Sequence, residues 1–123
     1  MKKIMFLIAL LVCTHTWAAP MWMQISTGYD GSRLQLDFNS FRYSGNVGTA
    51  TSRFIDSDDD GSIRVRDISV SAIDCFQGHG DLLTYKTKTN KLLYRDSFST
   101  NGTLGADRLG QVMCALISKK VKE

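Results

Sequence analysis

The chain has 123 residues, 43% of them hydrophobic, and its 15 Lys and Arg against 12 Asp and Glu give a formal net charge of +3. This length suits a single domain. The near-neutral balance excludes the usual composition of a nucleic-acid-binding protein, which carries a strong basic excess.

Residues 1–18 have the pattern of a secretory signal peptide. Two lysines precede an apolar run from Ile4 to Val12 that is too short to span a bilayer, which takes about 20 residues. Small residues just before position 19 favour cleavage after Ala18. The sequence therefore predicts export of one domain, residues 19–123, to the periplasm, with the cell surface or the medium as alternatives.

Three cysteines are present, and the first, Cys13, lies within the predicted signal peptide. An alternative interpretation makes Cys13 the lipidated residue of a lipoprotein box, although Val12 stands where a very small residue is expected. Cys75 and Cys114 remain after cleavage, and an even count in an oxidising compartment predicts a disulfide between them. In the loop-entropy model, such a bond stabilises the domain by roughly 4 kcal/mol.

The first half of the mature chain predicts strands joined by turns that contain glycine. Residues 33–38 alternate most clearly, because Leu34, Leu36 and Phe38 share one face and polar residues share the other. Glycines at 28, 31 and 45 supply the turn chemistry. The strands expected in this half are Trp22–Thr27, 33–38 and Val47–Ile55.

The second half begins with a β-branched segment, residues 63–75, whose alternation changes phase and predicts a bulge or bend near Asp67. Residues 104–119 then change to a helical period, with lysines at the carboxyl end where cations favour the helix dipole. The helix's apolar positions are Leu109, Val112, Met113, Leu116 and Ile117. Strands followed by one helix predict an α+β domain: an antiparallel sheet of about six strands with a C-terminal helix that the disulfide pins.

Residues 82–87 and 92–98 are expected to form a hairpin around Thr89 and Asn90, with Tyr85 opposite Tyr94. In this register one face packs on the core, and it carries Leu83, Tyr85, Thr87, Leu92 and Tyr94. The other face carries a basic group formed by Lys86, Lys88, Lys91 and Arg95. Solvation explains these cations most simply, and an acidic partner drawn by a local positive field is the functional alternative.

Five short segments of the mature chain are distinctive: Trp22, residues 36–41 and 42–47, Ile73-Asp74-Cys75 and Val112-Met113-Cys114. Together they resemble the surface-adhesin protein E family of exported bacterial proteins. The resemblance implies an antiparallel sheet with a disulfide-pinned C-terminal helix and a tendency to dimerise. It also implies binding of host extracellular-matrix or serum proteins.

Catalytic motifs are lacking in the mature sequence. Its one histidine, His79, lies between two glycines, whereas a serine–histidine–acid triad needs a base held in a fixed orientation. The sequence also has no Cys-x-x-Cys, phosphate-binding glycine loop or His-Glu-x-x-His motif. We therefore expect a protein that is not an enzyme and needs no cofactor.

One acidic loop has the spacing of a calcium site. Asp56, Asp58 and Asp60 precede a glycine in a D-x-D-x-D-G pattern, and Asp67 falls at the twelfth position of that loop. The flanking segments look like strands, and aspartate is one methylene shorter than the usual bidentate glutamate. A solvated loop is the simpler interpretation, and calcium is the alternative.

Together these features predict an exported, non-enzymatic binding protein that engages a protein partner through a sheet face or edge. A soluble periplasmic accessory protein, which binds an envelope component or assists an assembly, is the alternative function. An enzyme centred on His79 is a third hypothesis.

Overall fold

The structure, a computed structural model, describes residues 19–57 and 61–123. The predicted signal peptide, with Cys13, lies outside these residues. Six strands form one antiparallel sheet in which each strand neighbours the next one along the chain: β1 (Trp22–Thr27), β2 (Arg33–Ser44), β3 (Val47–Ile55), β4 (Ile63–Ser71), β5 (His79–Lys86) and β6 (Leu92–Ser99). Helix α2 (Ala72–Gln77) follows β4, and α3 (Gly105–Lys122) follows β6. The predicted α+β architecture is confirmed.

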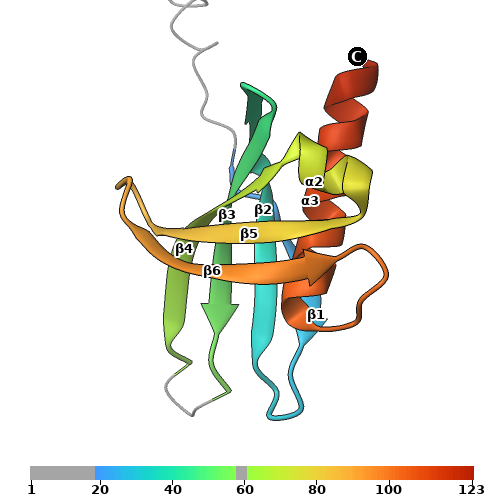
Figure 1. Ribbon diagram of the computed structural model, residues 1–123. Helices are drawn as coiled ribbons and strands as arrows, with labels where there is room; N and C mark the ends of the chain where they lie inside the picture. Colours follow the sequence, from blue (N-terminus) through green and yellow to red (C-terminus); the bar gives the residue numbers. More distant parts are fainter. Residues whose placement is uncertain (1–18, 58–60) are drawn as a thin grey trace, which may run out of the picture.

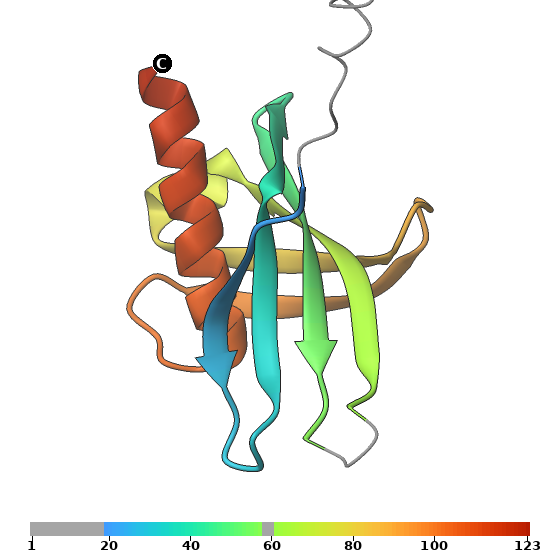
Figure 2. The ribbon, with the colours of Figure 1, turned by 180° about the vertical axis from the view of Figure 1, so that it is seen from behind.

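The sheet bends sharply between β4 and β5. Strands β1 to β4 run side by side, whereas β5 and β6 cross in front of them in Figure 1. The ladder that joins the two groups is short and runs from Arg66 opposite Lys86 to Ser69 opposite Leu83. The bend gives the sheet a concave inner face, and α3 lies along its open side, next to β1 and β6 (Figure 2).

The core fills the space between this inner face and α3. Alternating residues of the strands supply the sheet side, and the helical spacing of 109, 113 and 117 supplies the other. The buried apolar residues of the core are Leu36, Phe41, Ala50, Ile68, Val70, Ala72, Leu82, Phe98, Leu109, Met113 and Ile117. The apolar helix positions expected from the sequence are therefore confirmed as buried or half-buried.

A close approach brings α3 onto β6. A Cβ atom added to Gly110 would lie 2.4 Å from the ring of Phe98, which is closer than real side chains approach. The absent side chain lets the helix backbone sit directly on this ring. Glycine is therefore a packing requirement here, despite its low helix propensity.

Of the bulge or bend expected near Asp67, the bulge is wrong. The ladder between β3 and β4 runs without a register shift from Val47 opposite Ser71 to Ile55 opposite Ile63. The alternation of apolar residues in the sequence changes phase because the inner face of β4 carries arginines at one end and apolar residues at the other. Register shifts occur instead in the β1–β2 and β2–β3 ladders.

Helix α2 was not expected, because residues 63–75 look like one β-branched strand. The strand ends at Ser71, and α2 then buries Ala72 and stops at Gly78, whose φ of 85° is in the left-handed region. The Gly78 N–H donates to the carbonyls of Asp74 and Cys75, at 3.0 and 3.2 Å. This is a common helix ending, and the glycine was its signal in the sequence.

The predicted register of the β5–β6 hairpin is also wrong. Thr84, not Tyr85, lies opposite Tyr94, and a shift follows at the next pair. One residue of shift exchanges the two faces of a strand. Leu82 and Thr84 therefore lie on the inner face and are buried with Phe98. Leu92, opposite Tyr85, lies on the outer side, whereas Tyr94 shares the inner face with Thr84; both Leu92 and Tyr94 are exposed.

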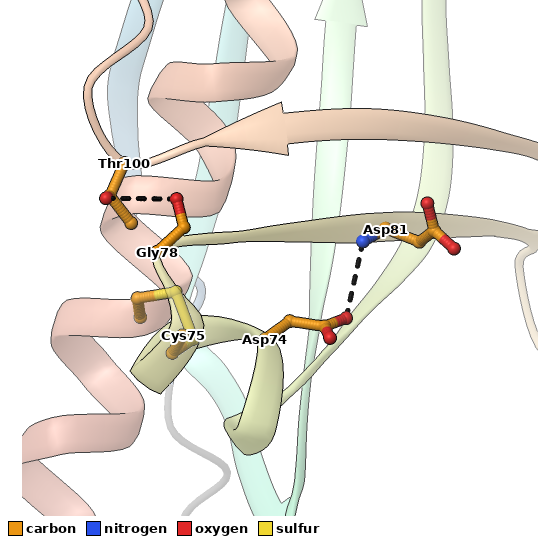
Figure 3. Close-up of a disulfide and its surroundings, with 6 residues drawn as sticks. Asp74, Cys75, Gly78, Asp81 and Thr100 are labelled. Carbon is orange, nitrogen blue, oxygen red and sulfur yellow. Dashed lines mark hydrogen bonds between the residues drawn. A yellow bond between two sulfur atoms is a disulfide. The ribbon is translucent and has the colours of Figure 1, made fainter.

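The disulfide between Cys75 and Cys114 is confirmed and joins α2 to α3. The two Cα atoms are 5.4 Å apart, within the range of roughly 4.4–6.8 Å that suits such a bond. Figure 3 shows Cys75 on α2 beside Asp74, whose carboxylate accepts the Asp81 N–H at 3.3 Å. In the same view Thr100 donates its hydroxyl to the Gly78 carbonyl, at 3.1 Å. These bonds hold α2 against β5 and the end of β6.

Within residues 19–57 and 61–123, no helix has the length and apolar character needed to cross a membrane.

Candidate functional site

The four cations of the predicted basic group do not share one face. Lys86 follows Leu82 and Thr84 in the alternation of β5, so it belongs to the inner side and lies opposite Arg66. Arg95 lies opposite Leu83 on the outer side and forms an ion pair with Asp81 at 3.2 Å. Lys88 and Lys91 are exposed at the hairpin turn. The expected group is therefore divided between the two sides of the hairpin.

The hairpin turn is tied to the rest of the sheet through Asp67. One oxygen of this carboxylate accepts the Lys88 N–H at 3.2 Å, and the other accepts the Thr51 hydroxyl at 3.1 Å. Lys88 adopts a φ of 62°, which its N–H contact helps to hold. Asp67 thus connects β3, β4 and the hairpin tip, a structural role that the sequence did not suggest.

The structure does not bring Asp67 to the acidic loop. Asp67 lies on β4 roughly 14 Å beyond Ile63, at the strand rise of about 3.4 Å per residue. Asp56 pairs with Arg64 at 3.1 Å, while Asp58 and Asp60 lie outside the described residues. The part of the chain that the structure describes holds no group of three or more His, Cys, Asp or Glu placed to bind a metal. Calcium binding by the loop stays an untested alternative.

His79 is exposed at the first position of β5. The nearby carboxylate of Asp74 is occupied by the Asp81 N–H. A third hydrogen-bonding group that orients the imidazole, which a catalytic triad requires, is not found among the bonds of the described residues.

The outer edge of the sheet at β6 is held by α3 at one end. The Ser99 N–H donates to the Asp107 carboxylate at 2.8 Å, and the Ser99 carbonyl accepts from the Gln111 amide at 3.4 Å. The second carboxylate oxygen of Asp107 accepts the Leu104 N–H at 3.0 Å and fixes the first turn of α3. Ser99 therefore directs its main-chain groups away from β5 and has them satisfied by the helix.

The rest of the β6 edge is open. In an antiparallel ladder, alternate residues direct their N–H and C=O outward, so the groups of Ser97 and Arg95 point the same way as those of Ser99. β6 is the last strand in the order of the described sheet, and residues 94–97 are all exposed. Leu92 and Tyr94 add apolar surface, with exposed fractions of 42% and 51%. This edge, Leu92–Ser97, is the candidate interaction site.

A second exposed apolar pair lies on α2. Ile73 and Phe76 are one helical turn apart and are 60% and 78% exposed. Both flank Cys75, so the disulfide fixes the short helix that presents them. The pair adds to the apolar surface near the end of β4.

The edge role of Arg95 and Ser97 could not be found from the sequence, because strand order is a property of the folded sheet. The role of Asp107, in contrast, could be predicted from the sequence. An acidic residue three positions after the start of a helix is half of a capping box, and Leu104 and Asp107 have that spacing.

Comparisons with protein-family models, with curated proteins and with solved structures found no match to this chain. The resemblance to the surface-adhesin family therefore stays a prediction from the short sequence segments that carry it.

Proposed function

We propose that this protein is an exported, non-enzymatic binding protein that adds an extended segment of a partner protein to the free edge of β6. The observation that carries the proposal is the open main-chain edge at Arg95 and Ser97, next to exposed Tyr94. An added strand gains affinity from main-chain hydrogen bonds and specificity from alternate side chains.

The charges along the β6 edge indicate which charged residues a partner segment carries. Arg95 lies on the outer side and Asp96 on the inner side of the extended sheet, because neighbouring residues alternate. Opposite charges on paired strands stabilise a sheet, and like charges destabilise it. The best partner segment therefore places an acidic residue beside Arg95 and a basic residue beside Asp96.

The compartment follows from the predicted signal peptide and is supported by the disulfide, since such bonds persist in oxidising environments. The periplasm is the first expectation. The family resemblance favours host extracellular-matrix or serum proteins as partners, at the cell surface. An envelope component is the partner if the protein acts instead as a soluble periplasmic accessory protein.

The test is capture by the oxidised domain, residues 19–123, from serum and from envelope extract, followed by binding measurements with each purified partner. The variant Ser97→Pro removes an outward N–H without removing a bond to β5, and Ser97→Ala keeps that N–H. We expect Ser97→Pro to weaken binding at least tenfold and Ser97→Ala to bind like the parent.

Amide exchange of the complex adds a readout that capture lacks. The amides of Arg95 and Ser97 should exchange rapidly in the free protein and become protected when the partner binds. Equal affinity of both Ser97 variants, with no new protection at these amides, would exclude the β6 edge. Pairing of two copies through this edge would instead show as a dimer by light scattering, with the same protection in the absence of a partner.

Cell fractionation separates the two roles. Protease added to intact cells should digest a surface adhesin and spare a periplasmic protein. Full protection from the protease would reject the adhesin role and leave the accessory one.

A further inference from the structure

A groove lies on the inner face of the sheet, beside the packed core. Its volume is about 850 Å³, and it is lined by the end of β1 and the turn that follows, by strands β2 to β6 and by the start of α3. In Figure 1 the lower ends of β1 to β4 extend past β6, so this part of the inner face has no strand in front of it. The volume falls in the range of roughly 300–1,000 Å³ typical of small-molecule sites.

The floor of the groove is apolar and continues the core. Ile68, Leu82 and Leu109 are buried below it, while Leu34 and Phe54 at the open end are half-buried. These residues share the inner face because side chains alternate along each strand. Half-buried leucine and phenylalanine side chains at this end leave apolar surface available to a ligand.

One wall of the groove is cationic. Arg64 and Arg66 line this wall and follow the same alternation on β4 as Ile68. Arg64 is bound to Asp56 at 3.1 Å and covers the Phe54 ring, with 5.0 Å between its guanidinium carbon and the ring centroid.

Arg66 keeps donors for a ligand. Its Nη1 donates to the Val65 carbonyl at 2.9 Å, and a guanidinium has five N–H donors. Among the described residues that line the groove, the one acid is Asp96, which lies on β6 at the opposite wall. The cationic end is therefore complementary to a single anionic group.

We propose that this groove binds a long-chain fatty acid, with its carboxylate on the Arg66 guanidinium and its acyl chain along Leu34, Phe54 and Leu109. A planar guanidinium binds a carboxylate through two parallel hydrogen bonds, which a neutral head group cannot reproduce. The apolar floor removes the chain from water. The groove shares Tyr94 and Asp96 with the β6 edge but uses their inner-face side chains, whereas the proposed partner binding uses the outward main-chain groups of Arg95 and Ser97, so neither proposal depends on the other.

The test uses a fluorescent long-chain fatty acid as the probe, titrated into residues 19–123 below the concentration at which it forms micelles, and displaced by palmitate. We expect saturable binding at one site per chain. Methyl palmitate should compete at least tenfold more weakly than palmitate, because it lacks the charge, and acetate should not compete, because it lacks the chain.

Two variants and a matched control assign the site. Arg66→Gln should weaken palmitate at least tenfold, and Lys91→Gln, which removes an exposed cation outside the groove, should not. Leu34→Glu should abolish binding, with far-UV circular dichroism confirming that the variant is folded. Ser97→Pro should bind palmitate like the parent. The fatty-acid site can therefore be tested even if the β6 edge binds no partner.

Several outcomes would overturn the inference. These are the absence of saturable binding, equal affinity for palmitate and its methyl ester, and an Arg66→Gln variant that binds like the parent. Stronger displacement of the probe by a short peptide with an apolar, carboxylate-bearing C-terminus than by palmitate would assign the groove to a peptide instead.

Discussion

The two ends of the sheet's inner face differ although the same alternation builds both. At the covered end, Leu36 and Ile68 belong to the same core cluster as Met113 of α3, and all three are almost fully buried. At the open end, Leu34 and Phe54 are half-buried and share the face with Arg64. The covered end holds the fold together, whereas the open end leaves apolar and cationic side chains next to solvent.

The alternation of apolar residues along a strand and the burial of those residues are therefore separate properties. Leu34 and Leu36 are neighbours on one face of β2 and are equivalent in the sequence pattern. Because of where β5, β6 and α3 lie, Leu36 belongs to the core, whereas Leu34 lies at the edge of the groove. An apolar residue at an inward position therefore indicates the face on which it lies, and its burial depends on what crosses that face.

The largest effect should come from breaking the covalent tie at the covered end. Replacing both Cys75 and Cys114 by serine should lower the free energy of unfolding by about 2–5 kcal/mol, because α2 and α3 are then joined by packing alone. Urea denaturation of parent and variant measures the difference. Peptide mass spectrometry of the exported parent should find the 75–114 cross-link, and two free thiols there would contradict the prediction.

Removing a core side chain at the covered end comes next. Met113 has no exposed surface, and Met113→Ala should cost about 3 kcal/mol through lost burial and the cavity left behind. Met23, 44% exposed on β1, is the matched control, and Met23→Ala should change stability by less than about 0.5 kcal/mol. Similar losses for the two variants would show that Met113 is not central to the core.

The close contact between α3 and β6 can be tested by adding a methyl group. Gly110→Ala places a methyl group against the Phe98 ring, and we expect a net loss of about 1–2 kcal/mol, since strain exceeds the helix-propensity gain of Ala. Thermal unfolding measures it. A gain of stability, as at an exposed helix position, would show that the ring moves aside freely.

The sharpest comparison uses two leucines of one strand. Leu36→Ala should cost at least about 1 kcal/mol more than Leu34→Ala, which lies at the groove and should itself cost about 1 kcal/mol. Both variants remove the same atoms from the same face of β2, so the difference reports the cover over each. Equal losses would mean that the groove end is packed as tightly as the core.

The smallest effect is expected from calcium. Millimolar calcium should leave the melting temperature unchanged, because Asp67 is bonded to Thr51 and Lys88 and is distant from the loop at Asp56. A ligand that binds only the folded state would raise it. A calcium-dependent rise that Asp56→Ala abolishes would assign a site to this loop.

The strands, the C-terminal helix and the disulfide were predictable because their signals are local or compositional. The hairpin register was not. Lys88 takes a positive φ and the ladder shifts between Thr84 and Tyr85, and such a shift moves every following residue to the other face. The free edge and the groove depend on how distant segments cross, and no local pattern in β4 or β6 records that crossing.

The order of the strands along the chain has a consequence for how the protein folds. Each strand pairs with its sequence neighbour, so successive hairpins can form from nearby residues, which favours rapid pairing. Helix α3 is different, because it comes last in chain order and yet packs against β1. Docking of α3 on β1 closes a loop that contains all the chain between them, which is entropically the most expensive step. Leu109, Met113 and Ile117 enter the core only in that step. We therefore expect helix docking, not strand pairing, to limit the rate of folding.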